Sequence, residues 1–253
     1  MRAKHTEDLD AYWDAQAILH RGAAAIDPAD TLGRKTAYIA HCRNLALASG
    51  LDQMAEGARV LDFGCGTGTF LTWLEQQRPD CSGYGIDLSS EMLHVALELH
   101  PNLAGHIATC DGRRLPMRGQ SIDVICTAIT LIYLTDDDAL LALAKEFRRA
   151  LVPGGLVVSV EQVRRHTHRQ IGYRKIQRAP EDYLRIFSEA GFTLQGWRQI
   201  RRGRFPLTYL IRYGLIPRAW MHPVANLESW LWRDSRLPSW DYADALFIWR
   251  APG

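Results

Sequence analysis

Three glycines at alternate positions give the chain its clearest chemical signature. Gly64, Gly66 and Gly68 follow the short apolar run 60–63, which contains Asp62. Because glycine has no Cβ, the backbone can approach a ligand closely and adopt positive φ angles. A dinucleotide-binding loop instead has the spacing G-x-G-x-x-G and holds a pyrophosphate. An acid at position 62 disfavours a pyrophosphate and suits a ligand that carries an ammonium group.

Two further carboxylates follow the next two apolar runs. Asp87 ends the run 81–86, and Asp111 comes shortly after the run 105–109. An acid about 20 residues after a glycine-rich loop typically accepts hydrogen bonds from ribose hydroxyls. Asp111 is placed to meet the amino group of an adenine. Together with the loop, these acids favour S-adenosylmethionine over NAD as the cofactor, with S-adenosylhomocysteine as its product.

The segments that carry these acids alternate between strand and helix patterns. We expect strands at 58–63, 81–86, 105–109, 123–127, 156–160, 192–201 and 243–249, and helices at 69–77, 90–100, 136–150 and 179–190. Such alternation predicts a parallel sheet with right-handed crossovers and helices on both faces. Ligands bind open α/β sheets at the carboxyl ends of the strands. All three acids are expected at that edge.

Several motifs in succession resemble those of the class I methyltransferases. They are the loop 60–70, the turn 85–89, the pair Asp111-Gly112, the run 123–128 and the segment 151–155. The resemblance implies an α/β, Rossmann-like fold with a seven-stranded, mostly parallel sheet. Its strand order would be 3-2-1-4-5-7-6, and its last strand would be antiparallel.

The same resemblance implies a set of cofactor-binding residues. Asp62 and Gly64 would hold the methionine amino group, Asp87 the ribose, and Asp111 with Gly112 the adenine. Residues 127–129 would line the channel for methyl transfer. The full expected set is Asp62, Gly64, Cys65, Gly66, Gly68, Asp87, Leu88, Asp111, Gly112, Thr127 and Ala128.

The chain is expected to form a single domain over residues 1–253, with three parts. Residues 1–54 form an N-terminal helical lid, with helices at 11–26 and 33–50. Residues 55–202 and 241–253 form the Rossmann-like core. Residues 203–240 form a helical insertion before the last strand, expected to cap the acceptor.

Methyl transfer requires a nucleophile aligned with the methyl group, and a hydroxyl or thiol acceptor generally needs a base. We expect His166 or His168 to supply that base, and Tyr133 to face the acceptor. A solvated charged loop is the alternative for the histidines, and simple packing is the alternative for Tyr133. Arginine binds carboxylate or phosphate in a bidentate manner. The expected substrate-binding residues are Tyr12, Arg164, Arg165 and Tyr173.

Positive charge is concentrated late in the chain. Residues 161–220 hold 13 Lys and Arg against 4 acids, whereas the net charge of the whole chain is +2. In the insertion 203–240, arginines alternate with tryptophan and tyrosine, which suits a membrane interface or an anionic lipid-linked acceptor. A helical cap that packs on the sheet or on a second subunit is the alternative. A sequence pI of about 8.3 and the lack of a recognisable module make nucleic acid an unlikely partner.

The five separated cysteines include no C-x-x-C pair, so neither a metal site nor a disulfide framework is expected. The N-terminus lacks an apolar leader pattern, and no run approaches 18 apolar residues. We therefore expect a cytoplasmic protein, with the inner face of the membrane as an alternative location. The oligomeric state is left open.

The expected function is S-adenosylmethionine-dependent O-methylation of a small-molecule, glycan or lipid-linked acceptor with anionic or hydroxyl character. An RNA or protein methyltransferase is the alternative with the same chemistry. A scaffold protein that binds S-adenosylmethionine without turnover is the alternative from another class.

Overall fold

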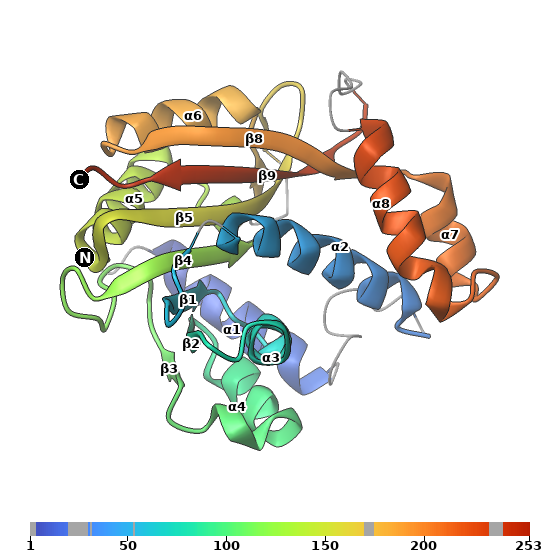
Figure 1. Ribbon diagram of the computed structural model, residues 1–253, viewed down its shortest axis with the longest axis horizontal. Helices are drawn as coiled ribbons and strands as arrows, with labels where there is room; N and C mark the ends of the chain where they lie inside the picture. The colour runs from blue at the N-terminus through green and yellow to red at the C-terminus, as the bar shows by residue number, and fades with distance from the viewer. Residues whose placement is uncertain (1–3, 20–29, 31, 53, 170–174, 233–239) are drawn as a thin grey trace.

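The computed structural model describes residues 4–19, 30, 32–52, 54–169, 175–232 and 240–253 (Figure 1). The strands are β1 (Arg59–Phe63), β2 (Ser82–Asp87), β3 (Ile107–Thr109), β4 (Ile122–Ala128), β5 (Leu151–Val163), β6 (His168–Arg169), β7 (Ile176–Gln177), β8 (Thr193–Arg202) and β9 (Ala243–Arg250). The α-helices are α1 (Lys4–Leu19), α2 (Arg34–Leu51), α3 (Thr69–Gln77), α4 (Ser90–Leu99), α5 (Asp137–Ala150), α6 (Pro180–Glu189), α7 (Pro206–Arg212) and α8 (Met221–Trp232). Three 3-10 turns, η2 (Pro101–Leu103), η3 (Leu131–Tyr133) and η4 (Arg218–Trp220), complete these elements.

The large sheet has the order β3-β2-β1-β4-β5-β9-β8. Its first five strands are parallel, and β9 runs antiparallel to both β5 and β8. Numbered consecutively within this sheet, the strands have the predicted order 3-2-1-4-5-7-6. The fold class and the antiparallel last strand are confirmed.

Both faces of the sheet are covered, which explains why its central strands are continuous apolar runs. On one face, α5 and α6 pack through Phe147, Tyr183 and Phe187. On the other face, α2 and α3 pack through Leu47 and Leu74. The edge of the sheet at the carboxyl ends of β1 to β5 is therefore framed by helices from both layers (Figure 1).

The first lid helix differs from its prediction. It spans Lys4–Leu19 rather than 11–26, and residues 20–29 lie outside the described part of the chain. Its position is set by packing, because Ala17 and Trp13 contact Met92 and Val95 of α4. The first residues of this helix are mostly charged or polar, so apolar residues recur only weakly at helical spacing. The start of the helix was therefore predicted too late in the chain. The second lid helix agrees closely with its prediction.

The insertion forms the expected helices, and they pack on the lid rather than on the sheet alone. Tyr38 and Cys42 of α2 form one apolar cluster with Ile211 of α7 and Val224 of α8. Figure 1 shows α7 and α8 side by side at the outer end of α2. The small β6-β7 sheet between β5 and α6 was not predicted.

Candidate functional site

The glycine loop leads from β1 into α3 and wraps around the end of β2. Gly64, Gly66 and Gly68 all have positive φ, at 79°, 52° and 75°. A Cβ on Gly64 would lie 2.4 Å from the Thr130 hydroxyl, so this glycine is needed for packing against the loop after β4. A Cβ on Gly66 would meet nothing within 4 Å. The loop therefore closes tightly at Gly64 and leaves open space at Gly66.

Asp87 is held against this loop by backbone amides. Its carboxylate accepts hydrogen bonds from the Gly66 amide at 2.8 Å and from the Ser89 amide at 2.9 Å. Burial raises the pKa of Asp87, while these backbone hydrogen bonds lower it in part. Asp87 thus lies at the end of β2 where the prediction places it, with a fixed orientation.

Asp62 lies beside Asp87 and is more deeply buried. Burial and the neighbouring Asp87 carboxylate raise the pKa of Asp62 to about 8. Among the described residues, no cation contributes to this shift. A ligand with an ammonium group would offset both effects, because it would pair with the buried carboxylate. The residues present therefore fit S-adenosylmethionine, whose methionine moiety carries such a group.

Three further predicted cofactor residues, Asp111, Gly112 and Leu88, follow strands β2 and β3. Asp111 is exposed and accepts a hydrogen bond from the Arg113 amide at 3.0 Å, and Gly112 packs beside Phe63 with a φ of 73°. Leu88 is half-buried directly after β2. The assignment of these residues to the adenine and the ribose stays a prediction.

The side chain of Cys65 points into the core. Its side chain is buried in an apolar cluster with Leu71, Leu93 and Leu103, and it faces Gly85. Burial raises the pKa of the thiol well above its ordinary value. Only the backbone of Cys65 is therefore available to a cofactor in the loop.

Thr127 departs from its expected role. Its hydroxyl is fully buried and hydrogen-bonds to Glu161 at 2.9 Å and to Ser159 at 3.0 Å. The side chain therefore supports the site from beneath instead of lining a channel. Ala128 is half-buried at the end of β4, and the next residue, Ile129, has a φ of 58°.

Glu161, at the end of β5, fixes the loop that follows β4. One oxygen of its carboxyl group accepts from the amides of Thr130 and Leu131 as well as from Thr127, and the other has no hydrogen-bond partner among the described residues. Burial raises the pKa of Glu161 to about 7, and these hydrogen bonds limit the rise. Glu161 was not among the predicted site residues. Its position directly after the apolar run 156–160 could have indicated a functional acid at the end of that strand.

Tyr133 lies at the end of this same loop and meets the lid. Its ring packs edge-on against Trp13 at 5.3 Å between centroids, and Trp13 packs in the same way against Tyr12. Burial raises the pKa of Tyr133, and Tyr12, Arg43 and Glu161 all act on its charge. The phenol therefore stays neutral near pH 7. The structure places it against the lid, and its role toward an acceptor stays a prediction.

The predicted histidines and arginines do not join this group. His166 and His168 are exposed at the β6-β7 sheet, and in the described part of the chain no hydrogen bond orients either ring. Arg165 is exposed, and Arg164 donates to the Gln177 side chain at 2.7 Å. Tyr173 lies outside the described residues. The hypothesis of a histidine base thus gains no support from this geometry.

A buried ionic cluster joins α2 to β8, β9 and α8. Asp244 is fully buried and accepts from Arg43 at 2.9 Å and from Arg201 at 3.3 Å. Burial by itself would raise the pKa of Asp244, but the two arginines hold it below its ordinary value. Nearby, Glu228 accepts from the Tyr38 hydroxyl at 2.7 Å. These contacts fix the lid and the insertion relative to the sheet, and Arg43 brings a cation close to Tyr133.

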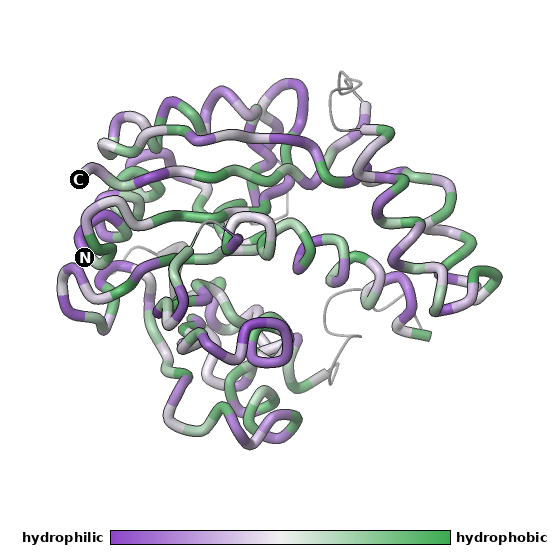
Figure 2. Tube along the Cα trace, viewed as in Figure 1, coloured by the Kyte–Doolittle hydropathy of each residue, from purple (hydrophilic) through white to green (hydrophobic). Residues whose placement is uncertain are grey.

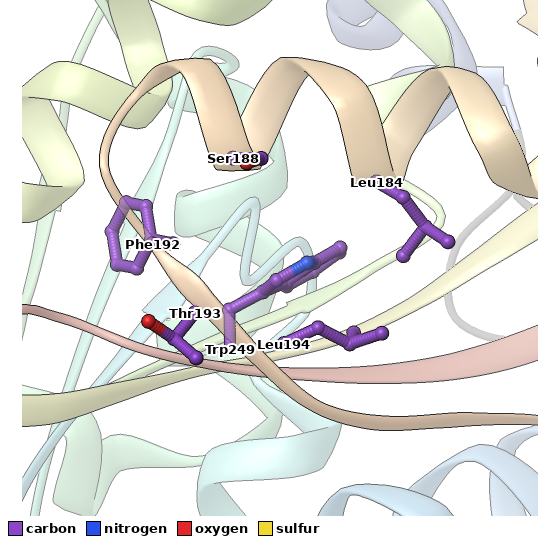
Figure 3. Close-up of a pocket in the computed structure, with 6 residues that line it drawn as sticks. All are labelled: Leu184, Ser188, Phe192, Thr193, Leu194 and Trp249. Atoms are coloured by element: carbon purple, nitrogen blue, oxygen red, sulfur yellow. The ribbon is translucent and has the colours of Figure 1, made fainter.

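The hollow shown in Figure 3 lies away from these residues. It is lined by Leu184 and Ser188 of α6 and by side chains near the outer ends of β8 and β9, including Trp249. Trp249 of β9 pairs with Val157, which precedes Glu161 by four residues on β5. The hollow beside Trp249 therefore lies toward the amino ends of the parallel strands. It is therefore separate from the candidate site.

Comparison with known proteins finds a family match for part of the chain. Residues 60–155 match the model of a methyltransferase domain. The demethylmenaquinone methyltransferase of Roseiflexus castenholzii is 37% identical over 109 residues, which make up 42% of this chain and 43% of that protein. The malonyl-acyl-carrier-protein O-methyltransferase of a Marinomonas species is 38% identical over 101 residues, or 39% of this chain and 36% of that protein. The match thus spans less than half of each of these curated relatives.

A solved structure extends the likeness to almost the whole chain. The geranyl diphosphate C-methyltransferase of Streptomyces coelicolor, solved with Mg²⁺, geranyl diphosphate and S-adenosylhomocysteine, matches with a TM-score of 0.65. The alignment covers 98% of both chains at 16% identity, a level that shows a shared fold. The family match is thus to a methyltransferase domain over residues 60–155, and the likeness over the rest of the chain is a likeness of fold.

Proposed function

We propose that the chain transfers the methyl group of S-adenosylmethionine to an oxygen atom of a small-molecule, glycan or lipid-linked acceptor with anionic or hydroxyl character. The proposal depends chiefly on one observation. Tyr133 ends a loop whose backbone amides donate to the buried Glu161 carboxyl group, and the Arg43 guanidinium acts on the charge of the Tyr133 phenol. These residues come from three distant segments, beside the loop that we assign to the cofactor.

The cofactor side of the proposal rests on charge. The buried Asp62 carboxylate would pair with the cofactor's ammonium group, and the amide-bound Asp87 would accept from the ribose. The sulfonium methyl group supplies the electrophile when the cofactor is bound. The loop after β4, held by Glu161, would then fix the acceptor relative to that methyl group.

On the acceptor side, each group has a distinct role. Tyr133 stays neutral, so it would donate a hydrogen bond to the acceptor oxygen rather than remove its proton. Arg43, with 16% of its side chain exposed, would attract an anionic acceptor. Glu161 is a positioning residue, because its hydrogen bonds are made to the loop. An acceptor that is already ionised, such as a carboxylate, needs no base.

The relatives' names support an oxygen acceptor only in part. The Marinomonas protein is named as an O-methyltransferase that acts on a malonyl group, which carries a carboxylate. The Streptomyces protein is named as a C-methyltransferase. An experiment on this chain must therefore distinguish oxygen from carbon as the acceptor atom.

The test is transfer of a labelled methyl group into a cell extract that is then separated into small-molecule, lipid, glycan, RNA and protein pools. We expect label in one of the first three pools, bound to oxygen. Methyl esters are released by mild base and methyl ethers by hydriodic acid, whereas C-methyl groups resist both. Asp62→Asn serves as the cofactor-side control and should lose the label.

Other outcomes would overturn the proposal in defined ways. Label confined to RNA or protein would establish the alternative substrate class. Label that survives both chemical treatments would show a carbon acceptor. Tight cofactor binding without transfer into any pool would favour the non-catalytic scaffold.

A further inference from the structure

Helices α7 and α8 and the segment between them expose several large apolar side chains. Tyr213, Leu215, Trp220 and Trp230 are 68%, 70%, 61% and 74% exposed. With Tyr209 and Leu227, we call these residues the outer patch. Single exposed apolar residues are common on proteins, but a gathering of this kind marks an interaction surface.

The inner faces of α7 and α8 already pack against other parts of the protein. Ile211 and Val224 pack on α2, and Glu228 is tied to Tyr38 and to the Arg202 amide. The outer patch is thus a second apolar face on a unit that is firmly attached to the lid. It is not a core face that happens to be uncovered.

The outer patch lies at one end of the molecule. Figure 1 shows α7 and α8 at the end of the molecule opposite the C-terminus. Figure 2 shows hydrophobic colour on α7, on the turn that follows it and on α8. A patch in this position can contact an extended surface without obstruction by the sheet.

Within residues 203–232, the charged side chains that reach the surface all have one sign. Arg204 and Arg218 are exposed and Arg212 is half-buried. Glu228 is the only acid in the described segment 203–232, and it is fully buried. Arg204 lies over the ring of the exposed Trp240, at 5.5 Å from its centroid. The surface is therefore apolar and cationic, with no exposed carboxylate in that segment.

This charge pattern argues against a second copy of the chain as the occupant. In a two-fold interface the same patch faces itself, so arginines of the two copies would approach each other without carboxylate partners. An anionic bilayer surface instead offers phosphate groups to arginine and an interfacial layer suited to tryptophan and tyrosine.

We propose that the outer patch docks the protein peripherally on an anionic membrane surface. In the described part of the chain, no helix is long and apolar enough to span a bilayer. The contact would therefore be interfacial, with the aromatic side chains at headgroup depth and the arginines on lipid phosphates. This inference does not depend on the acceptor class proposed above.

The test is flotation of the full chain with vesicles of phosphatidylcholine alone and with vesicles that also contain phosphatidylglycerol. We expect binding to the anionic vesicles at low salt and weaker binding at high salt, because salt screens the arginine contacts. The double variant Trp220→Ser, Trp230→Ser should lower vesicle affinity at least about tenfold, because two apolar side chains no longer enter the interface.

Two matched controls separate docking from general surface effects. Leu99→Ser removes an exposed apolar side chain of α4 and should leave vesicle binding unchanged. Arg218→Glu should reduce binding several-fold, whereas Arg118→Glu makes the same charge change just before β4 and should not. All variants should retain wild-type affinity for S-adenosylmethionine, which shows that they fold.

The proposal is overturned if the wild-type protein fails to float with anionic vesicles at low salt. Equal binding to both vesicle types would overturn the anionic assignment. A dimer that the tryptophan variants dissociate, in a protein that binds no vesicles, would show that the patch faces a second copy.

Discussion

The carboxyl edge of the sheet contains two regions that handle buried charge in opposite ways. At the β1–β2 end, Asp62 and Asp87 lie side by side without a cation among the described residues, and both have raised pKa values. At the β8–β9 end, Asp244 is paired with Arg43 and Arg201, and its pKa is lowered. The described residues supply no cation to the first carboxylate pair, whereas two arginines pair with the carboxylate of the second region.

This difference separates a binding site from a structural cluster. Buried charge is costly unless it is paired, so a region without its own partner is suited to a ligand that brings one. A region with internal partners holds elements together. The first arrangement is the one that we propose as the cofactor site, and the second forms the joint between lid, sheet and insertion.

The largest effect should come from breaking the structural cluster. Asp244→Ala leaves Arg201 buried without its carboxylate, which should lower the free energy of unfolding by about 3–5 kcal/mol. Urea unfolding measures this loss. Asp123→Ala is the matched control, because it breaks the partly exposed pair with Arg59 and should cost no more than about 1 kcal/mol. Equal losses would show that burial does not distinguish the two pairs.

The next effect concerns the cofactor region. Asp87→Ala should weaken binding of S-adenosylmethionine by about 1–3 kcal/mol, because a hydrogen-bond acceptor for the ribose is lost. Calorimetry with the cofactor and with S-adenosylhomocysteine measures the change. Asp111→Ala, at an exposed position, should weaken binding less. An unchanged affinity in Asp87→Ala would show that the ribose lies elsewhere.

Cofactor affinity should also depend on pH through Asp62. In the free protein this group titrates at about pH 8, and a bound ammonium group favours its ionised form. Binding below pH 8 should therefore release a proton, and affinity should rise with pH by at most about 1.4 kcal/mol per unit. Calorimetry in two buffers of different ionisation enthalpy counts the proton.

The same shift predicts the stability of the free protein. Because the folded pKa lies above the ordinary value of 3.8, the folded state binds more protons, and this contribution to stability is lost as pH rises through about 8. Asp62→Asn should remove the Asp62 contribution to both dependences. A pH profile identical to wild type in that variant would contradict the assignment.

The smallest effect should be at Tyr133. Tyr133→Phe removes one neutral hydrogen-bond donor. The resulting fall in kcat/KM should correspond to a loss of transition-state stabilisation of about 0.5–1.5 kcal/mol, and cofactor affinity should be unchanged. Tyr84→Phe, on β2, is the control and should change neither quantity. If Tyr133→Phe also weakens the binding of S-adenosylmethionine, Tyr133 contacts the cofactor instead of the acceptor.

The cofactor region could be predicted from the sequence because its parts are local. Gly64, Gly66 and Asp87 lie within one strand–helix–strand unit, and the hydrogen bond from Gly66 to Asp87 joins residues 21 positions apart. Alternating strands and helices predicted the α/β fold class, and the family resemblance implied the strand order.

The joint between lid, sheet and insertion could not be predicted in the same way. Arg43 and Asp244 are 201 positions apart, and Tyr38 and Glu228 are 190 apart. No local pattern links such residues, and the sequence directed attention to His166 and His168, which are exposed.

The amino-acid sequence by itself determined the sheet, the glycine loop and the acids at its strand ends, because backbone conformation and periodicity are short-range properties. Only the tertiary structure decided that Cys65 and Thr127 are buried supports, that Glu161 holds the loop after β4, and that α7 and α8 expose the outer patch. Those outcomes depend on which side chains remain unpaired once distant segments have packed together.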